Sequence, residues 1–162
     1  MPELDERAHA LAEELVGRAT RSGVAVATAE SCTAGMVASL IAGVPGASAV
    51  LKGGAVTYTD EIKRDVLGVS GATLAAHTAV SAACAEEMAI RAAALFEADL
   101  AVSLTGYAGP GGGTAADPAG TVYIGIRTPR GASVERHVFS GSRNAVRLQA
   151  AVRALELLVA AV

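Results

Sequence analysis

A serine where a strand gives way to a helix is the first residue of this chain that could do chemistry. Residues 28 to 35 read Thr-Ala-Glu-Ser-Cys-Thr-Ala-Gly and follow the apolar run Val24 to Ala27. At such a turn Ser31 lies beside unpaired backbone N–H groups and the positive end of a helix dipole, so it could be a nucleophile with donors for an oxyanion nearby. The structural alternative is that Ser31 or Thr33 only caps the helix that follows.

A glycine-rich segment is the second candidate binding element. Residues 106 to 114 read Gly-Tyr-Ala-Gly-Pro-Gly-Gly-Gly-Thr and follow an expected strand that ends at Thr105. Loops at strand ends bind ligands in α/β sheets, and glycines let backbone N–H groups surround a phosphate or carboxylate. The segment lacks the end of a P-loop and the Rossmann spacing, so neither ATP nor NAD binding is indicated, and a flexible surface loop is the alternative. The glycines concerned are Gly106, Gly109, Gly111, Gly112 and Gly113.

The base that a serine nucleophile needs is not evident among the histidines. They fall on the first expected helix, on a loop between helices and on a hairpin, as His9, His77 and His137. Tyr58 and Lys63 instead stand at the end of a strand and on the short helix after it. Ser-Lys and Ser-Tyr-Lys arrangements replace a histidine when the lysine pKa falls from about 10.4 toward neutrality. The alternative makes Lys63 part of a solvated helix face and Tyr58 a strand-end anchor.

Composition and charge argue against several other classes of protein. Of the 162 residues 52% are apolar and 18% charged, and the formal net charge is -3. Without tryptophan or a basic cluster, no nucleic-acid-binding surface is expected. Cys32 and Cys84 have neither paired spacing nor neighbouring histidines, which argues against a metal site and agrees with a reducing compartment. We expect no metal and no cofactor, and we expect Cys32 to pack instead of reacting.

The chain is expected to be a single domain over residues 1–162, with no role at a membrane. No apolar run reaches the roughly 18 residues of a membrane span. The start, Met-Pro-Glu-Leu-Asp-Glu-Arg, lacks the basic and apolar parts of a secretory signal, so we expect a cytoplasmic protein. A homodimer through the alanine-rich helix 81–96 is left open, because such a face could equally well be internal.

Hydrophobic periodicity predicts the elements that must position these residues. Helices are expected over about 3–21, 33–42, 60–67, 81–96 and 142–160, with Cys84, Met88 and Leu95 on the inner side of the fourth. Strands are expected over 24–27, 48–58, 100–105, 121–127 and 133–139, the last two as a hairpin. Gly53 and Gly54 would mark a bulge or a close backbone approach. This order predicts an α/β fold, a three-layer α/β/α sandwich with a mixed, mostly parallel sheet.

Several of these segments, taken together, resemble one protein family. They are residues 29–33, 44–48, 53–58, Lys63 with 67–69, 79–81, and 105–114 with 120–123. In this order, over about residues 5 to 160, they are similar to the CinA C-terminal family, the nicotinamide-nucleotide amidohydrolases. The chain looks like the stand-alone form, without the N-terminal pyrophosphatase-like domain of longer members.

The resemblance implies a specific reaction and a specific set of residues. The reaction is hydrolysis of the carboxamide of nicotinamide mononucleotide to nicotinic acid mononucleotide and ammonia, in pyridine-nucleotide salvage. Ser31 would be the nucleophile and Tyr58 and Lys63 the proton-transfer pair. Backbone N–H groups near residues 33–35 would hold the oxyanion, and two arginines of the last helix would complete an anion site. The substrate-binding residues expected on this basis are Thr33, Ala34, Gly35, Thr105, Gly106, Gly109, Gly111, Gly112, Gly113, Arg143 and Arg147.

Three residues depart from the family's pattern. Ala34 and Thr78 stand where glycines are common, and Tyr107 stands where a smaller aliphatic residue is usual. The side chain of Tyr107 could narrow or reshape the pocket, so the departures bear on substrate preference and rate more than on reaction type. Two other functions stay open: a nucleotide-binding or regulatory module of the CinA type that lacks hydrolysis, and another small amidase that does not need the phosphate.

Overall fold

A five-stranded mixed sheet forms the centre of the fold in the computed structural model, which describes residues 2–162. The strands are β1 (Val26–Glu30), β2 (Leu51–Val56), β3 (Leu100–Gly106), β4 (Thr121–Thr128) and β5 (Gly131–Val138), in the order β2-β1-β3-β4-β5. The β1–β2 and β1–β3 pairings are parallel, whereas β3–β4 and β4–β5 are antiparallel. The mixed sheet is confirmed, but its pairings divide evenly instead of being mostly parallel. The reason is that β3 returns to β4 through a loop and not through a crossover helix.

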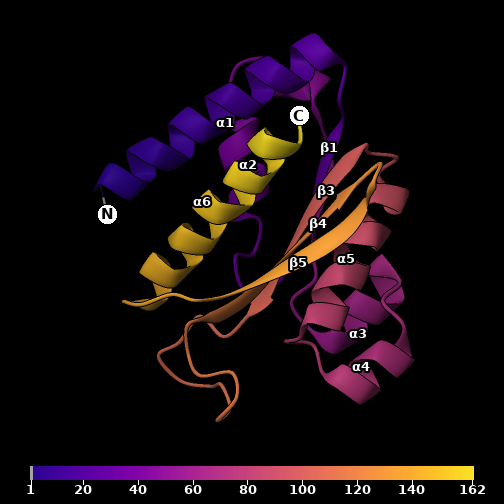
Figure 1. Cartoon of the computed structure of the whole chain (residues 1–162), viewed down its shortest axis with the longest axis vertical. Helices are drawn as coiled ribbons and strands as arrows, with labels where there is room; N and C mark the ends of the chain where they lie inside the picture. The colour runs from indigo at the N-terminus through magenta and orange to yellow at the C-terminus, as the bar shows by residue number, and fades with distance from the viewer. Residues whose placement is uncertain (1) are drawn as a thin grey trace.

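Helices cover both faces of the sheet and complete the expected α/β/α sandwich (Figure 1). On one face lie α1 (Pro2–Ser22), α2 (Met36–Ala42) and α6 (Arg143–Ala161). On the other lie α5 (Ala82–Leu95) and the short elements α3 (Asp60–Ile62), η2 (Lys63–Leu67, a π-helical turn) and α4 (Gly71–His77). A 3-10 turn, η1 (Ala47–Ala49), precedes β2. Each face has its own hydrophobic cluster, the larger one beneath α1, α2 and α6.

The apolar stripes of the long helices account for their packing. In α1 the stripe is buried at Ala8, Ala12, Leu15 and Ala19, which are all 0% exposed. The alanines let α1 approach α6 closely, while full burial of a side chain such as Leu15 contributes about 1.5–3 kcal/mol. Leu95, which we expected on the inner side of α5, is instead 50% exposed at its last turn.

Several predicted boundaries moved, and one helix was missed. The strand expected over 48–58, for example, is Leu51–Val56 and follows a 3-10 turn. The first strand was expected at 24–27 but is Val26–Glu30, because polar Thr28 and Glu30 are buried in a central strand. The following helix accordingly begins at Met36 and not near residue 33. The sequence did not predict α4, since it buries none of its residues and so has no apolar stripe; Ser70 caps it by accepting from the Thr73 N–H.

Gly53 and Gly54 mark both the bulge and the close approach that were predicted. The β1–β2 register shifts beside them, between Val26 and Ala27. A Cβ on Gly53 would lie 2.6 Å from the ring of Phe96, and one on Gly54 would lie 2.5 Å from Thr28 Oγ1. A Cβ on Gly54 would also lie 3.1 Å from Ala38 Cβ of α2, whereas Phe96 directly follows α5, so β2 is fixed between the two helical layers.

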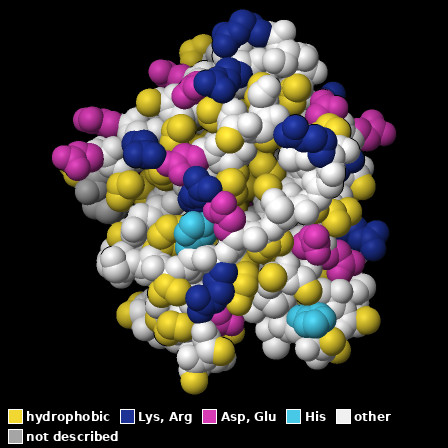
Figure 2. All heavy atoms as spheres, in the orientation of Figure 1, with side chains coloured by type: hydrophobic (Ala, Val, Ile, Leu, Met, Phe, Trp, Pro, Cys, Tyr) yellow, Lys and Arg dark blue, Asp and Glu magenta, His cyan; other side chains and the backbone are white. Residues whose placement is uncertain are grey.

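Three properties of the described residues concern membranes, metal ions and surface charge. Among residues 2–162, none of the helices combines the length and apolar character needed to cross a membrane. The same residues contain no group of three or more His, Cys, Asp or Glu side chains placed to hold a metal ion. On the face shown in Figure 2, Lys and Arg side chains lie interspersed with Asp and Glu.

The packing of α5 on β4 leaves no room for a methyl group at Gly125. A Cβ on Gly125 would lie 2.5 Å from Ala85 O and 2.6 Å from Ser103 Oγ. We expect Gly125→Ala to lower the free energy of unfolding by about 2 kcal/mol, because α5 must move off the sheet. In the matched variant Gly71→Ala the new methyl meets nothing within 4 Å. Urea denaturation should find the Gly71 variant at least as stable as the parent, and equal stability of both variants would contradict the expectation.

Candidate active site

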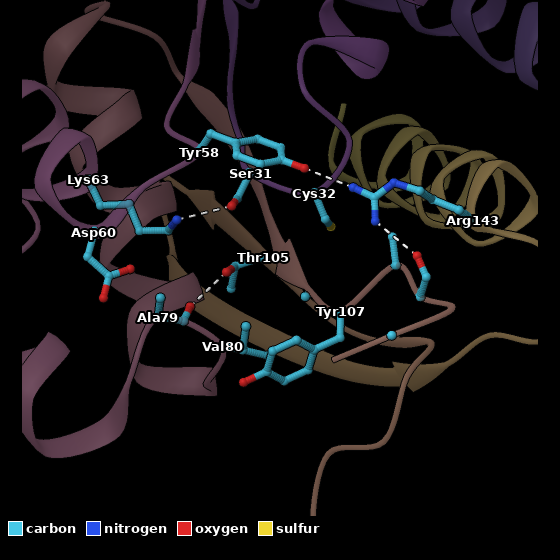
Figure 3. A pocket seen from close by; sticks show the side chains of 14 residues that line it. Ser31, Cys32, Tyr58, Asp60, Lys63, Ala79, Val80, Thr105, Tyr107 and Arg143 are labelled. Carbon is cyan, nitrogen blue, oxygen red and sulfur yellow. Dashed lines mark hydrogen bonds between the residues drawn. The ribbon is translucent and has the colours of Figure 1, made fainter. Parts of the chain in front are cut away.

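One cavity of about 220 Å³ gathers most of the predicted site residues (Figure 3). It opens where the parallel strands β1, β2 and β3 end at the same edge of the sheet, which is the usual ligand position in such folds. Ser31 follows β1, Tyr58 follows β2 and Thr105 lies at the end of β3. The lining residues are Ser31, Cys32, Tyr58, Asp60, Lys63, Ala79, Val80, Thr105, Gly106, Tyr107, Ala108, Gly109, Gly111 and Arg143.

A buried lysine contacts the serine. Lys63 begins η2, is 1% exposed, and points its amino group into the cavity, where Nζ lies 3.0 Å from Ser31 Oγ and donates to Thr57 O at 2.8 Å. Burial lowers the pKa of Lys63, and the nearby Cys84, Asp60 and Cys32 oppose this only in part. The pair therefore has the two properties of an activated nucleophile: hydrogen-bond contact, and a base whose neutral form is easier to reach than that of an exposed lysine.

The two thiols near Ser31 and Lys63 have raised pKa values, whereas the pKa of Lys63 is lowered. Cys32 and Cys84 are free and buried, and burial raises the pKa of each to about 11. Each thiol thus stays protonated near neutral pH, so Cys32 is a poor nucleophile although it lines the cavity. This agrees with the expectation that Cys32 packs.

A buried carboxylate organises the turn that carries Ser31. Glu30 is 0% exposed and accepts from the backbone N–H groups of Gly35 and Val37, each at 3.1 Å, and of Ala38 at 2.9 Å. The carboxylate therefore lies at the N-terminus of α2, where the helix dipole favours an anion. This role of Glu30 was not predicted, because the expected strand ended before Glu30.

The oxyanion donors expected near residues 33–35 stay a prediction, and two of these N–H groups already have protein partners. The Ala34 N–H donates to Ser31 O, the Gly35 N–H donates to Glu30, and Thr33 is completely buried. None of the three lines the cavity. The backbone N–H that directly follows the serine belongs to Cys32, which does line it.

The two arginines of α6 have different positions. Arg143 crosses the cavity mouth, donating to the Tyr58 hydroxyl at 2.8 Å and to Gly109 O at 3.0 Å. Arg147 lies outside the cavity and donates to Cys32 O at 3.0 Å and to Thr33 O at 2.9 Å, so it supports the serine turn instead of a ligand. Figure 3 shows the Tyr58 hydroxyl directed toward Arg143 and away from Ser31. The proton-transfer role of Tyr58 therefore stays a prediction.

The glycine loop is only partly a cavity wall. Thr105, Gly106, Gly109 and Gly111 line the cavity, whereas Gly112 and Gly113 do not. Gly113 has a structural task, because it pairs with Pro118 and a Cβ there would lie 2.7 Å from Ala119 N. The Thr105 hydroxyl donates to Ala79 O at 2.7 Å and so holds a neighbouring wall segment.

Several lining residues were not predicted. They are Asp60, Ala79, Val80 and Ala108, together with Tyr107, which was noted only as a departure from the family pattern. The available signal for Asp60 was its position three residues before Lys63 on one short helix.

Two of the three departures have a backbone explanation. Ala34 has φ 51° and Thr78 has φ 65°, a left-handed conformation that favours glycine. Glycine would therefore fit both positions with less strain, and the two residues replace it without reaching into the cavity. Tyr107 has no such explanation, and its side chain does line the cavity.

Comparison with known proteins gives consistent matches. Residues 8–162 match the family model described as CinA C-terminal domain. A nicotinamide-nucleotide amidohydrolase, PncC, of Escherichia coli K12 is 48% identical over 147 residues, which cover 90% of this chain and 89% of that protein. The crystal structure of the competence damage-inducible protein A of Klebsiella pneumoniae superposes with a TM-score of 0.91 at 38% identity, covering 94% of this chain and 95% of that one.

Other relatives are much longer than this chain. A CinA-like protein of Thermotoga neapolitana is 46% identical over 145 residues, which are 89% of this chain but only 35% of that protein. The chain thus spans about a third of the length of some of the curated relatives that it matches.

The position of Glu30 predicts a large effect on stability. We expect Glu30→Gln to lower the free energy of unfolding by about 3 kcal/mol, because the amide cannot replace a carboxylate that accepts three N–H groups in the interior. The matched variant Glu14→Gln changes an exposed carboxylate of α1 and should stay within about 0.5 kcal/mol of the parent. Chemical denaturation measures both, and a similar loss in the two variants would contradict the role given to Glu30.

Proposed function

Because the chain belongs to the CinA C-terminal domain family, we propose that it hydrolyses the carboxamide of nicotinamide mononucleotide, giving nicotinic acid mononucleotide and ammonia. The observation that carries the proposal is the 3.0 Å contact between Lys63 Nζ and Ser31 Oγ at the wall of a cavity. The relative named nicotinamide-nucleotide amidohydrolase supports the choice of substrate. The reaction would belong to pyridine-nucleotide salvage.

The first half of the reaction forms an acyl-enzyme. The neutral amine of Lys63 accepts the Ser31 proton while Ser31 Oγ bonds to the carboxamide carbon, and the carbonyl electrons move onto oxygen. The Cys32 backbone N–H is our candidate donor to that oxyanion, since it directly follows the serine at the cavity wall. Collapse of the intermediate breaks the C–N bond as the Lys63 ammonium returns its proton to the nitrogen, which leaves as ammonia.

The second half returns the enzyme to its starting state. Lys63 accepts a proton from a water molecule, and the water oxygen bonds to the acyl carbon. The C–Oγ bond then breaks and Ser31 recovers its proton from Lys63, which releases the nicotinic acid product. One base therefore serves both halves, consistent with a lysine whose pKa is lowered by burial.

The anionic end of the substrate would bind at the cavity mouth. Arg143 uses two donors on Tyr58 and Gly109, and its always-charged guanidinium has further donors for a phosphate. Backbone groups at Gly109 and Gly111 lie on the same wall. We propose that Tyr58 also contacts the substrate, because its hydroxyl accepts from Arg143 at the same wall.

Ammonia release tests the reaction directly. In buffer with EDTA, wild-type protein should release one ammonia per nicotinic acid mononucleotide formed. Ser31→Ala should slow this by about 10³-fold or more while still binding the substrate, because it removes the nucleophile but not the cavity. Near-normal turnover in the variant would defeat the scheme. A wild type that binds the mononucleotide without releasing ammonia would indicate a binding module, and equal turnover of free nicotinamide would indicate a less specific amidase.

The pH profile tests the base. Lys63 must be neutral to accept a proton. The value of kcat/KM should therefore be low at acidic pH, where Lys63 is protonated, and should rise as the pH passes through its lowered pKa. Lys63→Arg stays protonated throughout and should lose about 10³-fold in turnover. A flat wild-type rate between about pH 6 and 9 would count against Lys63 as the base.

A further inference from the structure

Asp60 is a carboxylate in the cavity that the proposed chemistry does not use. It is the first residue of α3, lines the same cavity as Ser31 and Lys63, and is exposed. Its carboxylate forms no side-chain hydrogen bond or ion pair with another of residues 2–162, although its charge lies near enough to Lys63 to raise the pKa of that amine. A negative charge of this kind, at the wall of a binding cavity, favours a positively charged ligand group.

Two aromatic rings border the same space. Tyr107 is half-buried, and its backbone is fixed on both sides, since its N–H donates to Thr121 O at 2.8 Å and its carbonyl accepts from the Gly120 N–H at 2.7 Å. Figure 3 shows the rings of Tyr58 and Tyr107 on opposite sides of Ser31 and Thr105. Both tyrosines line the cavity, so a flat ligand ring that reached Ser31 would have aromatic side chains in the surrounding wall, and aromatic rings attract cations.

The charges of the cavity are separated. Asp60 comes from α3 beside Lys63, whereas Arg143 comes from α6 at the opposite side of the view in Figure 3. Such an arrangement is complementary to a ligand with a cationic ring at one end and an anion at the other. In nicotinamide mononucleotide, ribosylation of the ring nitrogen makes the ring a pyridinium cation, and the phosphate is the anion.

We propose that the cavity recognises the positive charge of an N-ribosylated pyridinium ring through the Asp60 carboxylate and the rings of Tyr58 and Tyr107. This inference rests on the proposed function, because it concerns the same site and substrate. The same carboxamide on a neutral ring, as in the reduced 1,4-dihydro mononucleotide or in free nicotinamide, is bound less tightly. Tyr107 thereby has a task that a smaller aliphatic residue could not perform.

Binding to the Ser31→Ala protein separates recognition from chemistry. Isothermal titration would compare the oxidised and the reduced mononucleotide, which share ribose, phosphate and carboxamide but differ in ring charge. We expect the oxidised form to bind about tenfold more tightly, a ratio that corresponds to one desolvated cation–π or charge contact. Equal affinities would overturn the inference.

Substitutions in the same background identify the residues responsible. Asp60→Asn and Tyr107→Leu should each reduce the preference about fivefold by weakening binding of the oxidised form, with the reduced form within about twofold of the parent. Tyr107→Phe keeps the ring and should keep the preference. Glu61→Gln is the matched control, since it removes the neighbouring charge of α3 at a residue that does not line the cavity. A preference that survives Asp60→Asn would overturn the inference.

The outcome is independent of turnover. If wild-type protein releases ammonia from the mononucleotide but binds both ring forms equally, only this inference fails. If no ammonia is released under any condition, the proposed function fails, whatever the binding preference.

Discussion

A lysine amine held out of water is the constraint on which the site depends. Lys63 is 1% exposed and is among the largest fully buried side chains of the described residues. Removing an ammonium group from water is costly unless the group is neutral or hydrogen-bonded. The chain meets this requirement with Thr57 O at the end of β2 and Ser31 Oγ at the end of β1. The π-helical turn η2 provides the geometry, with the Val69 N–H closing onto Lys63 O at 2.9 Å.

The turn that carries Ser31 is held from two sides by opposite charges. At its end the Gly35 N–H and two N–H groups from the first turn of α2 donate to the buried Glu30 carboxylate, and the carbonyls of Cys32 and Thr33 accept from Arg147. Donors thus meet an anion and acceptors meet a cation, as the polarity of backbone groups requires. Since Arg147 belongs to α6 and Glu30 to β1, the serine is fixed to two layers of the sandwich at once.

The sequence predicted the parts of the fold with strong periodic patterns and the parts of the site that their chemistry or the family resemblance marks. The long helices and the hairpin have enough periodic apolar residues to be recognised. In contrast, α4 has no fully buried residue and therefore no apolar stripe in the sequence. Ser31 and Lys63 were predicted from their chemistry and from the resemblance, and the structure brings them into contact. Arg143 and Arg147 could not be separated, because residues four apart share a helix face and only tertiary packing decides which one reaches the cavity. Glu30 was missed because a charged residue in a buried strand contradicts the usual pattern, which its three N–H partners explain.

Ala34 and Thr78 affect how much conformational entropy the chain loses when the cavity walls fold. Both occupy left-handed backbone conformations, one just after the serine and the other just before the Ala79 and Val80 wall. A side chain at such a position strains the folded state by roughly 1 kcal/mol, yet it also restricts the conformations of the unfolded chain more than glycine would. Segments that usually owe their shape to glycine are here less free before folding. The two walls of the cavity therefore lose less conformational entropy when they become ordered.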